Sequence, residues 1–265
     1  AWQNPADRSY LRFSLMMSHN KNTLKEISEA MKSYNEQQTA LATSSNKPLS
    51  KYYDGVSMDA IWAVPSLGID PATGKEIYLV TDEDGNQYRT FTYDGNKQVV
   101  CGDALPKING NAGISFEYKG FGFNAVCTYR WGGKMYNTTL VNKVENADLN
   151  GNVDRRIFTG RWRKPGDISP YKALGKVYVA SQDEMASPKT NPTTRFVQKN
   201  NDLTISSLQL SYDFFRHGFV KQMGLERIVL RCTVNELHKF STIKIERGTD
   251  YPFARTFDLA LSITL

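Results

Sequence analysis

The sequence lacks long hydrophobic runs and the known motifs of catalytic sites. No stretch approaches the roughly 18 apolar residues that a membrane helix needs, and the mean hydropathy is −0.48. The three histidines, His19, His217 and His238, lie far apart in the sequence. A GxSxG elbow, an HExxH motif and a Walker loop are all missing. We therefore expect no helical membrane spans and no catalytic residues.

Cysteines are also scarce, and no metal site is expected. Cys101, Cys127 and Cys232 are odd in number and show no metal-ligand spacing, so they are interpreted as small apolar fillers. Residues 82–86 and 148–154 are acidic enough to resemble calcium loops. The first lacks the alternating ligand pattern and the terminal glutamate of such a loop. The second does alternate, but Gly151 falls at the fourth place instead of the sixth and no glutamate occupies the twelfth, so we expect turns and no cofactor.

The charge balance gives little support for nucleic-acid binding. Lys and Arg number 33 against 27 Asp and Glu, a net charge of +6, but the basic residues are scattered. One basic group, within residues 155–164, flanks Trp162 and could stack on a base or hold an anion. A solvated loop is the commoner meaning of such a group, so no nucleic-acid partner is expected.

Alternation of apolar and polar residues predicts an all-β protein. In the clearest segment, every second residue from position 257 is apolar: Phe257, Leu259, Leu261, Ile263 and Leu265. Five other segments alternate in the same way: 11–17, 114–119, 121–130, 207–214 and 227–234. A phase slip between Ile205 and Leu208 predicts a β-bulge.

The connections between these strands alternate in length. Long stretches at 20–110, 132–201 and 236–252 are separated by a tight turn at Lys119–Gly120 and a shorter one at 217–224. Short turns on one side and long loops on the other are typical of an outer-membrane barrel. Aromatic residues near the strand ends also suit an interfacial girdle. A soluble β-sandwich remains open, because alternation alone predicts it equally well.

The long loops carry local signals of their own. A Thr23/Glu26 capping box and apolar residues at helical spacing predict a short helix over residues 23–34. Residues 68–75 and 82–86 predict tight turns of β-hairpins.

Five segments together resemble one protein family. They are SMDAIWAVPSLGIDPATGKEIYL (57–79), LPKINGNAGISFEYKGFGFNAVCTYRWGGKMYN (105–137), NVDRRIFTGRWRKPGDISP (152–170), NPTTRFVQKNNDLTISSLQLSYDF (191–214) and YPFARTFDLALSITL (251–265). In this order they are similar to segments of the SusC/RagA family of TonB-linked outer-membrane proteins of Bacteroidetes-type bacteria. The chain departs from the family pattern at Leu265, where an aromatic residue is usual.

The resemblance implies that residues 1–265 are the C-terminal part of a large transmembrane β-barrel with long extracellular loops. Its antiparallel strands are too few for the 22-stranded barrel of such transporters, and the plug and N-terminal strands are absent. The N-terminus also lacks signal-peptide features, so the chain is expected to be processed or part of a longer protein.

The implied function is TonB-dependent import of an oligosaccharide or peptide through the outer membrane. A SusD-like surface lipoprotein would cap the extracellular side, and TonB would act through the plug. Outer-membrane lipid would surround the strands, with the strand from Phe257 to Leu265 important for barrel assembly. The candidate ligand contacts are exposed loop aromatics: Tyr52, Tyr53, Trp62, Tyr136 and Trp162. The alternative for each of these rings is that it only packs the loop.

Two other classes of protein stay open at this point. A soluble, surface-exposed β-sandwich module could bind glycans with the same aromatic residues. A glycan-active hydrolase could use a carboxylate pair such as Asp82 and Asp84, although these are turn residues first.

Overall fold

A computed structural model describes residues 2–4, 9–147, 153–173, 190–215, 217–243 and 255–265. The chain forms two compact units, which we describe separately. The first contains residues 1–20, 106–132 and 200–265, and the second contains residues 21–105 and 133–199. None of the described helices combines the length and the apolar character needed to cross a bilayer.

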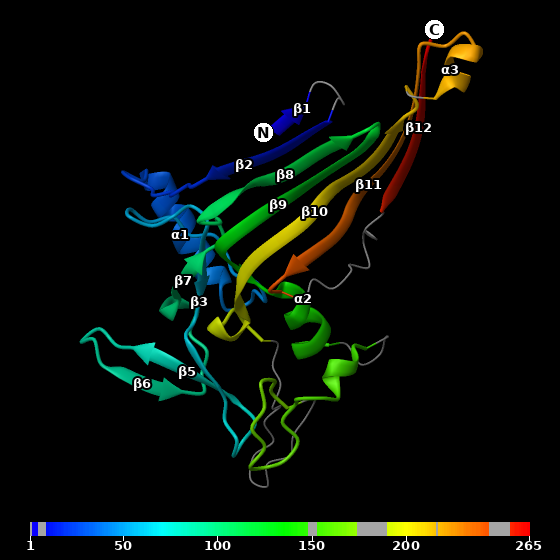
Figure 1. The fold of residues 1–265 in the computed structure, drawn as a ribbon. Coiled ribbons are helices and arrows are strands. Elements are labelled where there is room, and N and C mark those ends of the chain that lie inside the picture. The colour runs from blue at the N-terminus through cyan, green and yellow to red at the C-terminus, as the bar shows by residue number, and fades with distance from the viewer. Residues whose placement is uncertain (1, 5–8, 148–152, 174–189, 216, 244–254) are drawn as a thin grey trace. The chain divides into compact units, whose positions relative to one another are not determined.

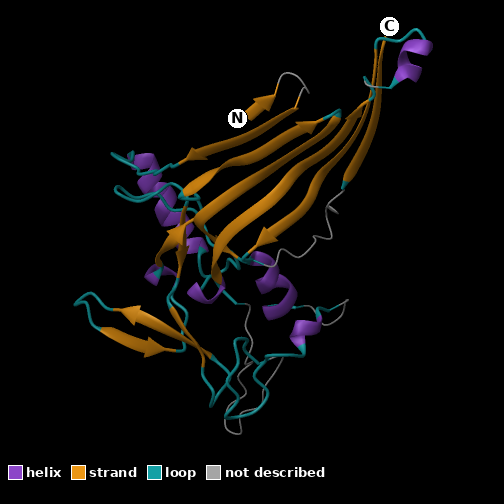
Figure 2. Cartoon of the chain, in the orientation of Figure 1, coloured by secondary structure: helices purple, strands orange, loops and turns teal. Residues whose placement is uncertain are grey.

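The first unit is built on one twisted sheet (Figures 1 and 2). Its seven strands lie in the order β1-β2-β8-β9-β10-β11-β12. Their bounds are β1 Trp2–Asn4, β2 Ser9–Ser18, β8 Ile108–Tyr118, β9 Phe121–Tyr136, β10 Val197–Asp213, β11 Arg227–Ser241 and β12 Thr256–Thr264. All six predicted strands are therefore present, and the short β1 is an addition. The strand pairs for which a register is defined are antiparallel.

The predicted turn at Lys119 and Gly120 is confirmed. Both residues have positive φ, 52° and 94°, which suits a two-residue hairpin that follows the twist of the strands. Tyr118 pairs with Phe121 across the turn. The connection from β10 to β11 instead contains a short helix, α3 (Gly218–Gln222).

The predicted irregularity in β10 is confirmed as well. The register with β11 shifts between Ile205 and Ser207. On the other strand, Glu236 adopts a φ of 50°, unusual for a residue with a side chain. The shift keeps the apolar residues of β10 on one face, because Ile205 and Leu208 both pair with residues of that face in β11.

Close packing at Gly110 fixes the neighbouring strands. A Cβ at this position would lie 1.9 Å from the backbone oxygen of Met16, and the Tyr129 hydroxyl donates to that same oxygen at 3.0 Å. We expect Gly110→Ala to destabilise the full-length protein by about 1–3 kcal/mol, because backbone must move. Denaturant unfolding measures this. Gly113→Ala is the control, since there the nearest atom is the Ser14 hydroxyl, which can rotate away. Equal effects would contradict the described packing.

The second unit contains small sheets and short helices. β3 (Ala60–Ala63) pairs with β7 (Val99–Asp103). β4 (Ser66–Ile69), β5 (Glu76–Thr81) and β6 (Gln87–Thr90) form two hairpins. The predicted hairpin turns at 68–75 and 82–86 are thereby confirmed. The helical segments are α1 (Glu29–Leu41), η1 (Gly95–Lys97), α2 (Thr138–Leu140), η2 (Val141–Glu145), η3 (Arg155–Ile157) and η4 (Thr194–Phe196).

The helix predicted over residues 23–34 is placed wrongly. α1 begins at Glu29, and Ser28 is its N-cap, with its side chain accepting from Met31 N at 3.4 Å. Glu26 cannot belong to the first turn, because its φ is 55°. The Ile27 amide instead donates to Asp54 Oδ1 at 3.0 Å. A contact with a distant residue therefore overrides the local capping box.

Candidate functional site

One face of the sheet is apolar across its strands. Cys232 pairs with Leu259 on one side and with Leu210 on the other. The same face continues on the first strands, where Phe13 pairs with Ile114 and Leu15 with Ala112. Along each strand these residues alternate with polar ones. The apolar side chains of neighbouring strands therefore lie side by side on one face of the sheet.

This apolar face is not covered within the described residues. Leu259 is 75% exposed and Leu15 is 73% exposed, and Phe13, Phe257 and Leu261 are similarly open. A β-sandwich would bury such a face against a second sheet. The described sheet therefore does not form a sandwich core. A continuous exposed apolar surface of this kind marks a contact with a membrane or another protein.

The opposite face carries charged pairs and hydroxyl groups. Arg130 on β9 binds Asp202 on β10 with an N–O distance of 2.7 Å, and Arg227 on β11 binds Asp213 on β10 at 2.6 Å. Near the turn end, this face has a hollow of about 230 Å³ that includes Asp213 and Arg227 in its lining. The two faces of the sheet thus differ sharply in polarity.

β12 lies at an edge of the sheet. It pairs with β11 along its length, from Arg227↔Thr264 to Asn235↔Thr256. Its other side has no strand partner among the residues that the structure describes. A long apolar edge with unpaired backbone groups is a site where a further strand would add.

Two of the predicted loop aromatics form an open pair in the second unit. The rings of Tyr53 and Trp62 lie 5.2 Å apart, and Trp62 Nε1 donates to the Lys51 carbonyl at 3.1 Å. Tyr53 is exposed and Trp62 half-buried. Nearby in sequence, Tyr52 stacks on Tyr34 with the ring centroids 5.8 Å apart. These rings are held in place and still present surface to solvent.

The other two aromatics are buried, so the expectation that they are exposed is wrong. Tyr136 is 7% exposed and lies in a core cluster with Phe196. Trp162 is 3% exposed, and its Nε1 donates to the Pro71 carbonyl at 2.8 Å. Its ring lies over Gly74, where a Cβ would come within 2.6 Å. Both side chains pack the unit, and Trp162 does not present a surface for stacking on a nucleic acid.

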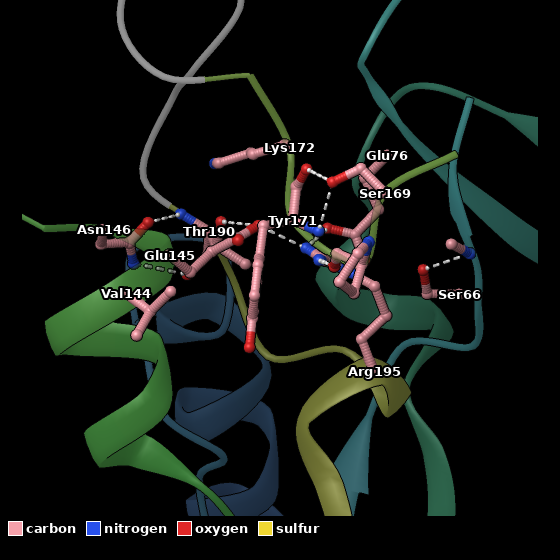
Figure 3. A network of polar contacts seen from close by, with 12 residues as sticks. Ser66, Glu76, Val144, Glu145, Asn146, Ser169, Tyr171, Lys172, Thr190 and Arg195 are labelled. Atoms are coloured by element: carbon pink, nitrogen blue, oxygen red, sulfur yellow. Dashed lines mark hydrogen bonds and ion pairs between the residues drawn. The ribbon is translucent and has the colours of Figure 1, made fainter. Parts of the chain in front are cut away.

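A buried ion cluster in the second unit was not foreseen from the sequence (Figure 3). The Arg195 guanidinium binds both oxygens of Glu76, at 2.9 and 2.8 Å, and Glu145 Oε1 at 2.6 Å. It also donates to the Pro170 carbonyl at 2.7 Å. The cluster joins β5, η2 and η4, which are far apart in the sequence. Arg195 lies within residues 191–214, one of the segments that carry the family resemblance. That resemblance is the only signal in the sequence that could have pointed to Arg195.

Residues around this cluster are buried, among them Arg161 and Lys172. Burial lowers the pKa of Lys172 to about 8, opposed by the nearby Glu145 and Glu76 carboxylates. Burial likewise raises the pKa of Tyr93 to about 12. In this buried position, the two carboxylates need the charge of the guanidinium to offset the cost of their own burial.

The acidic segments behave as turns where the structure describes them. Asp82 Oδ1 accepts from Asn86 N at 2.7 Å, and Asp154 Oδ1 accepts from Arg156 N at 2.8 Å. Residues 148–152 lie outside the described residues. In the described part of the chain, no cluster of three or more His, Cys, Asp or Glu side chains could hold a metal ion.

Comparisons with known proteins show what the chain resembles. No family model matches the chain. It is 24% identical over 166 residues to "TonB-dependent receptor P39" of Formosa agariphila, a match that covers 62% of this chain and 15% of that protein. The structure of the RagAB peptide transporter is similar over 99% of this chain and 28% of the RagAB chain, with 17% sequence identity and a TM-score of 0.72. The chain is SusC/RagA-like. The "open-open" RagAB peptide importer is similar in the same way, with a TM-score of 0.71 and 15% identity.

The matches fix the fold class of the SusC/RagA-like chain as antiparallel strands of the kind found in RagA. The relatives are a receptor and peptide transporters, and no enzyme is among them. The chain spans only 15% of the curated relative and 28% of the RagAB chain.

Proposed function

We propose that residues 1–265 are the C-terminal part of the barrel of an outer-membrane TonB-dependent importer. The observation that carries this is the exposed apolar face of β2, β11 and β12, opposite a polar face with paired charges. Lipid outside and water inside require this division of a barrel wall. The open edge of β12 would pair with another strand of the same barrel.

The cargo is a peptide or an oligosaccharide, taken up with energy from TonB acting on a plug upstream of these residues. A peptide is the cargo of the RagAB transporter, whose structure the chain resembles. A SusD-like surface lipoprotein is the proposed partner, because RagAB joins a receptor to a lipoprotein. The second unit consists of the two long insertions between strands, so it would lie on the extracellular side. The host would be a Bacteroidetes-type bacterium.

Uptake assays test this function. Cells that lack the gene for the full-length receptor, and the same cells complemented, are given labelled peptide and oligosaccharide mixtures. Uptake of one cargo class should return only with the complementing gene, and it should stop when the proton-motive force is removed. Import that is the same with and without the receptor would contradict the proposal.

The Tyr53–Trp62 pair is the proposed ligand contact. Replacing both residues with Ala should weaken cargo binding to the full-length receptor roughly 10-fold or more, because an exposed aromatic face contributes about 1–3 kcal/mol to stacking. Calorimetry on the purified receptor measures this. Trp162→Ala is the contrasting variant, since loss of a buried ring should lower loop stability instead. Unchanged affinity in the Tyr53→Ala/Trp62→Ala variant would remove these rings from the binding site.

A further inference from the structure

The connection between β10 and β11 holds a compact group of rings that the proposed function does not use. His217 lies between Tyr212 and Phe219, with ring centroids 5.8 Å from each. The Phe214 and Phe219 centroids are also 5.8 Å apart. A hydrogen bond of 2.9 Å joins the Tyr212 hydroxyl to His217 Nε2. These contacts fix α3 against the end of β10.

α3 is built with one apolar side turned outward. Val220 is buried, whereas Phe219 is 43% exposed and Met223, just after the helix, is 64% exposed. Phe219 and Met223 are four residues apart, so they share one side of the turn. Leaving both side chains exposed to water is unfavourable, because apolar surface is more stable when it is removed from water.

The neighbouring turn has the same character. Asp213 N, at the end of β10, donates to the Gly120 carbonyl at 2.8 Å, so the β8–β9 turn and the β10–β11 connection are adjacent. At this turn Tyr118 and Phe121 are exposed. The Lys119 ammonium lies 5.0 Å from the centre of the Tyr118 ring. Figure 1 shows α3 at this end of the sheet.

We propose that α3 is an interfacial anchor, which lies in the headgroup zone of the phospholipid leaflet on the short-turn side. Phe219 and Met223 contact acyl chains, and Lys119 and Lys221 lie near the phosphates. Two observations select lipid as the occupant. The aromatic surface continues from the apolar face of β10 through Tyr212, and both exposed cations complement anionic phosphate. The inference rests on the proposed barrel function.

Photo-crosslinking in the full-length receptor tests the anchor. A benzophenone amino acid is placed at Phe219 in cells, and after irradiation the purified receptor is digested and its adducts are identified by mass spectrometry. Gln209, on the polar face of β10, is the control position that faces away from lipid. Leu259, on the apolar face of β12, is the reference position for lipid contact.

The expected result is phospholipid adducts at Phe219 and Leu259 and none at Gln209. Adducts at Leu259 but not at Phe219 would overturn the anchor and leave the barrel function standing. Protein adducts at Phe219 would also overturn it, because α3 would then be a docking site for a protein. Lipid adducts at neither position would contradict the barrel function itself.

Discussion

Replacing Phe257, Leu259 and Leu261 with Asp should abolish assembly of the full-length receptor in the outer membrane. All three side chains lie on the exposed apolar face of the edge strand. A charge on the lipid face of a barrel at the bilayer midplane is unfavourable by about 2–4 kcal/mol for Arg or Lys, and by less for Asp. Three such charges together approach the total stability of a typical domain, about 5–15 kcal/mol.

Assembly can be followed by the heat-modifiable mobility of the folded barrel in membrane fractions. The matched control places three Asp residues on the other face of the same strand, at Ala260, Ser262 and Thr264. Ala260 pairs with Arg231 and Thr264 with Arg227, so acidic side chains there have basic neighbours. The control should assemble. Equal assembly of both variants would show that β12 has no lipid-facing side.

Replacing Arg195 with Met should unfold the second unit without removing the barrel. The Arg195 side chain is 9% exposed, and those of Glu76 and Glu145 are 4% and 0% exposed. Loss of the guanidinium would leave two buried carboxylates facing each other, and breaking a buried ion pair in this way costs about 3–5 kcal/mol. Glu145 Oε2 already has no hydrogen-bond partner among the described residues.

Limited proteolysis of the full-length receptor distinguishes the two units. In Arg195→Met, residues 21–105 and 133–199 should be cut rapidly while the heat-modifiable barrel remains. Adding Glu145→Gln should restore part of the resistance, because one uncompensated charge is removed. Lys32→Ala is the control, since its ion pair with Glu29 is exposed to water and should contribute little to stability. Resistance equal to wild type in Arg195→Met would contradict a stabilising role for the buried ion cluster.

Strand positions were predictable because a sheet with one apolar and one polar face has an apolar residue at every second position of each strand. Leu259 and Leu261 show this alternation. The tight turn at Lys119–Gly120 also fixes the register of the two strands that it joins. Alternation did not separate a barrel from a sandwich, because it records which residues share a face and not what covers that face. The family segments and the exposure of the face supplied that answer.

The loop unit was harder to predict, because contacts between distant residues decide its structure. Trp162 packs against Gly74 and donates a hydrogen bond to Pro71. The hydrogen bond joins residues that are 91 positions apart in the sequence. α1 begins late because Asp54 holds the Ile27 amide. The Arg195 cluster likewise joins residues separated by 119 and 50 positions. Local patterns carry no trace of such contacts.

The central claim is that this sheet is a wall of an outer-membrane barrel, and membrane fractionation of the full-length product tests it most directly. Cells that produce the product are lysed, and the two membranes are separated by density. We expect the product in the outer-membrane fraction, with a folded form that migrates differently before and after heating. Recovery in the soluble fraction, as a folded protein without heat-modifiable mobility, would contradict the account.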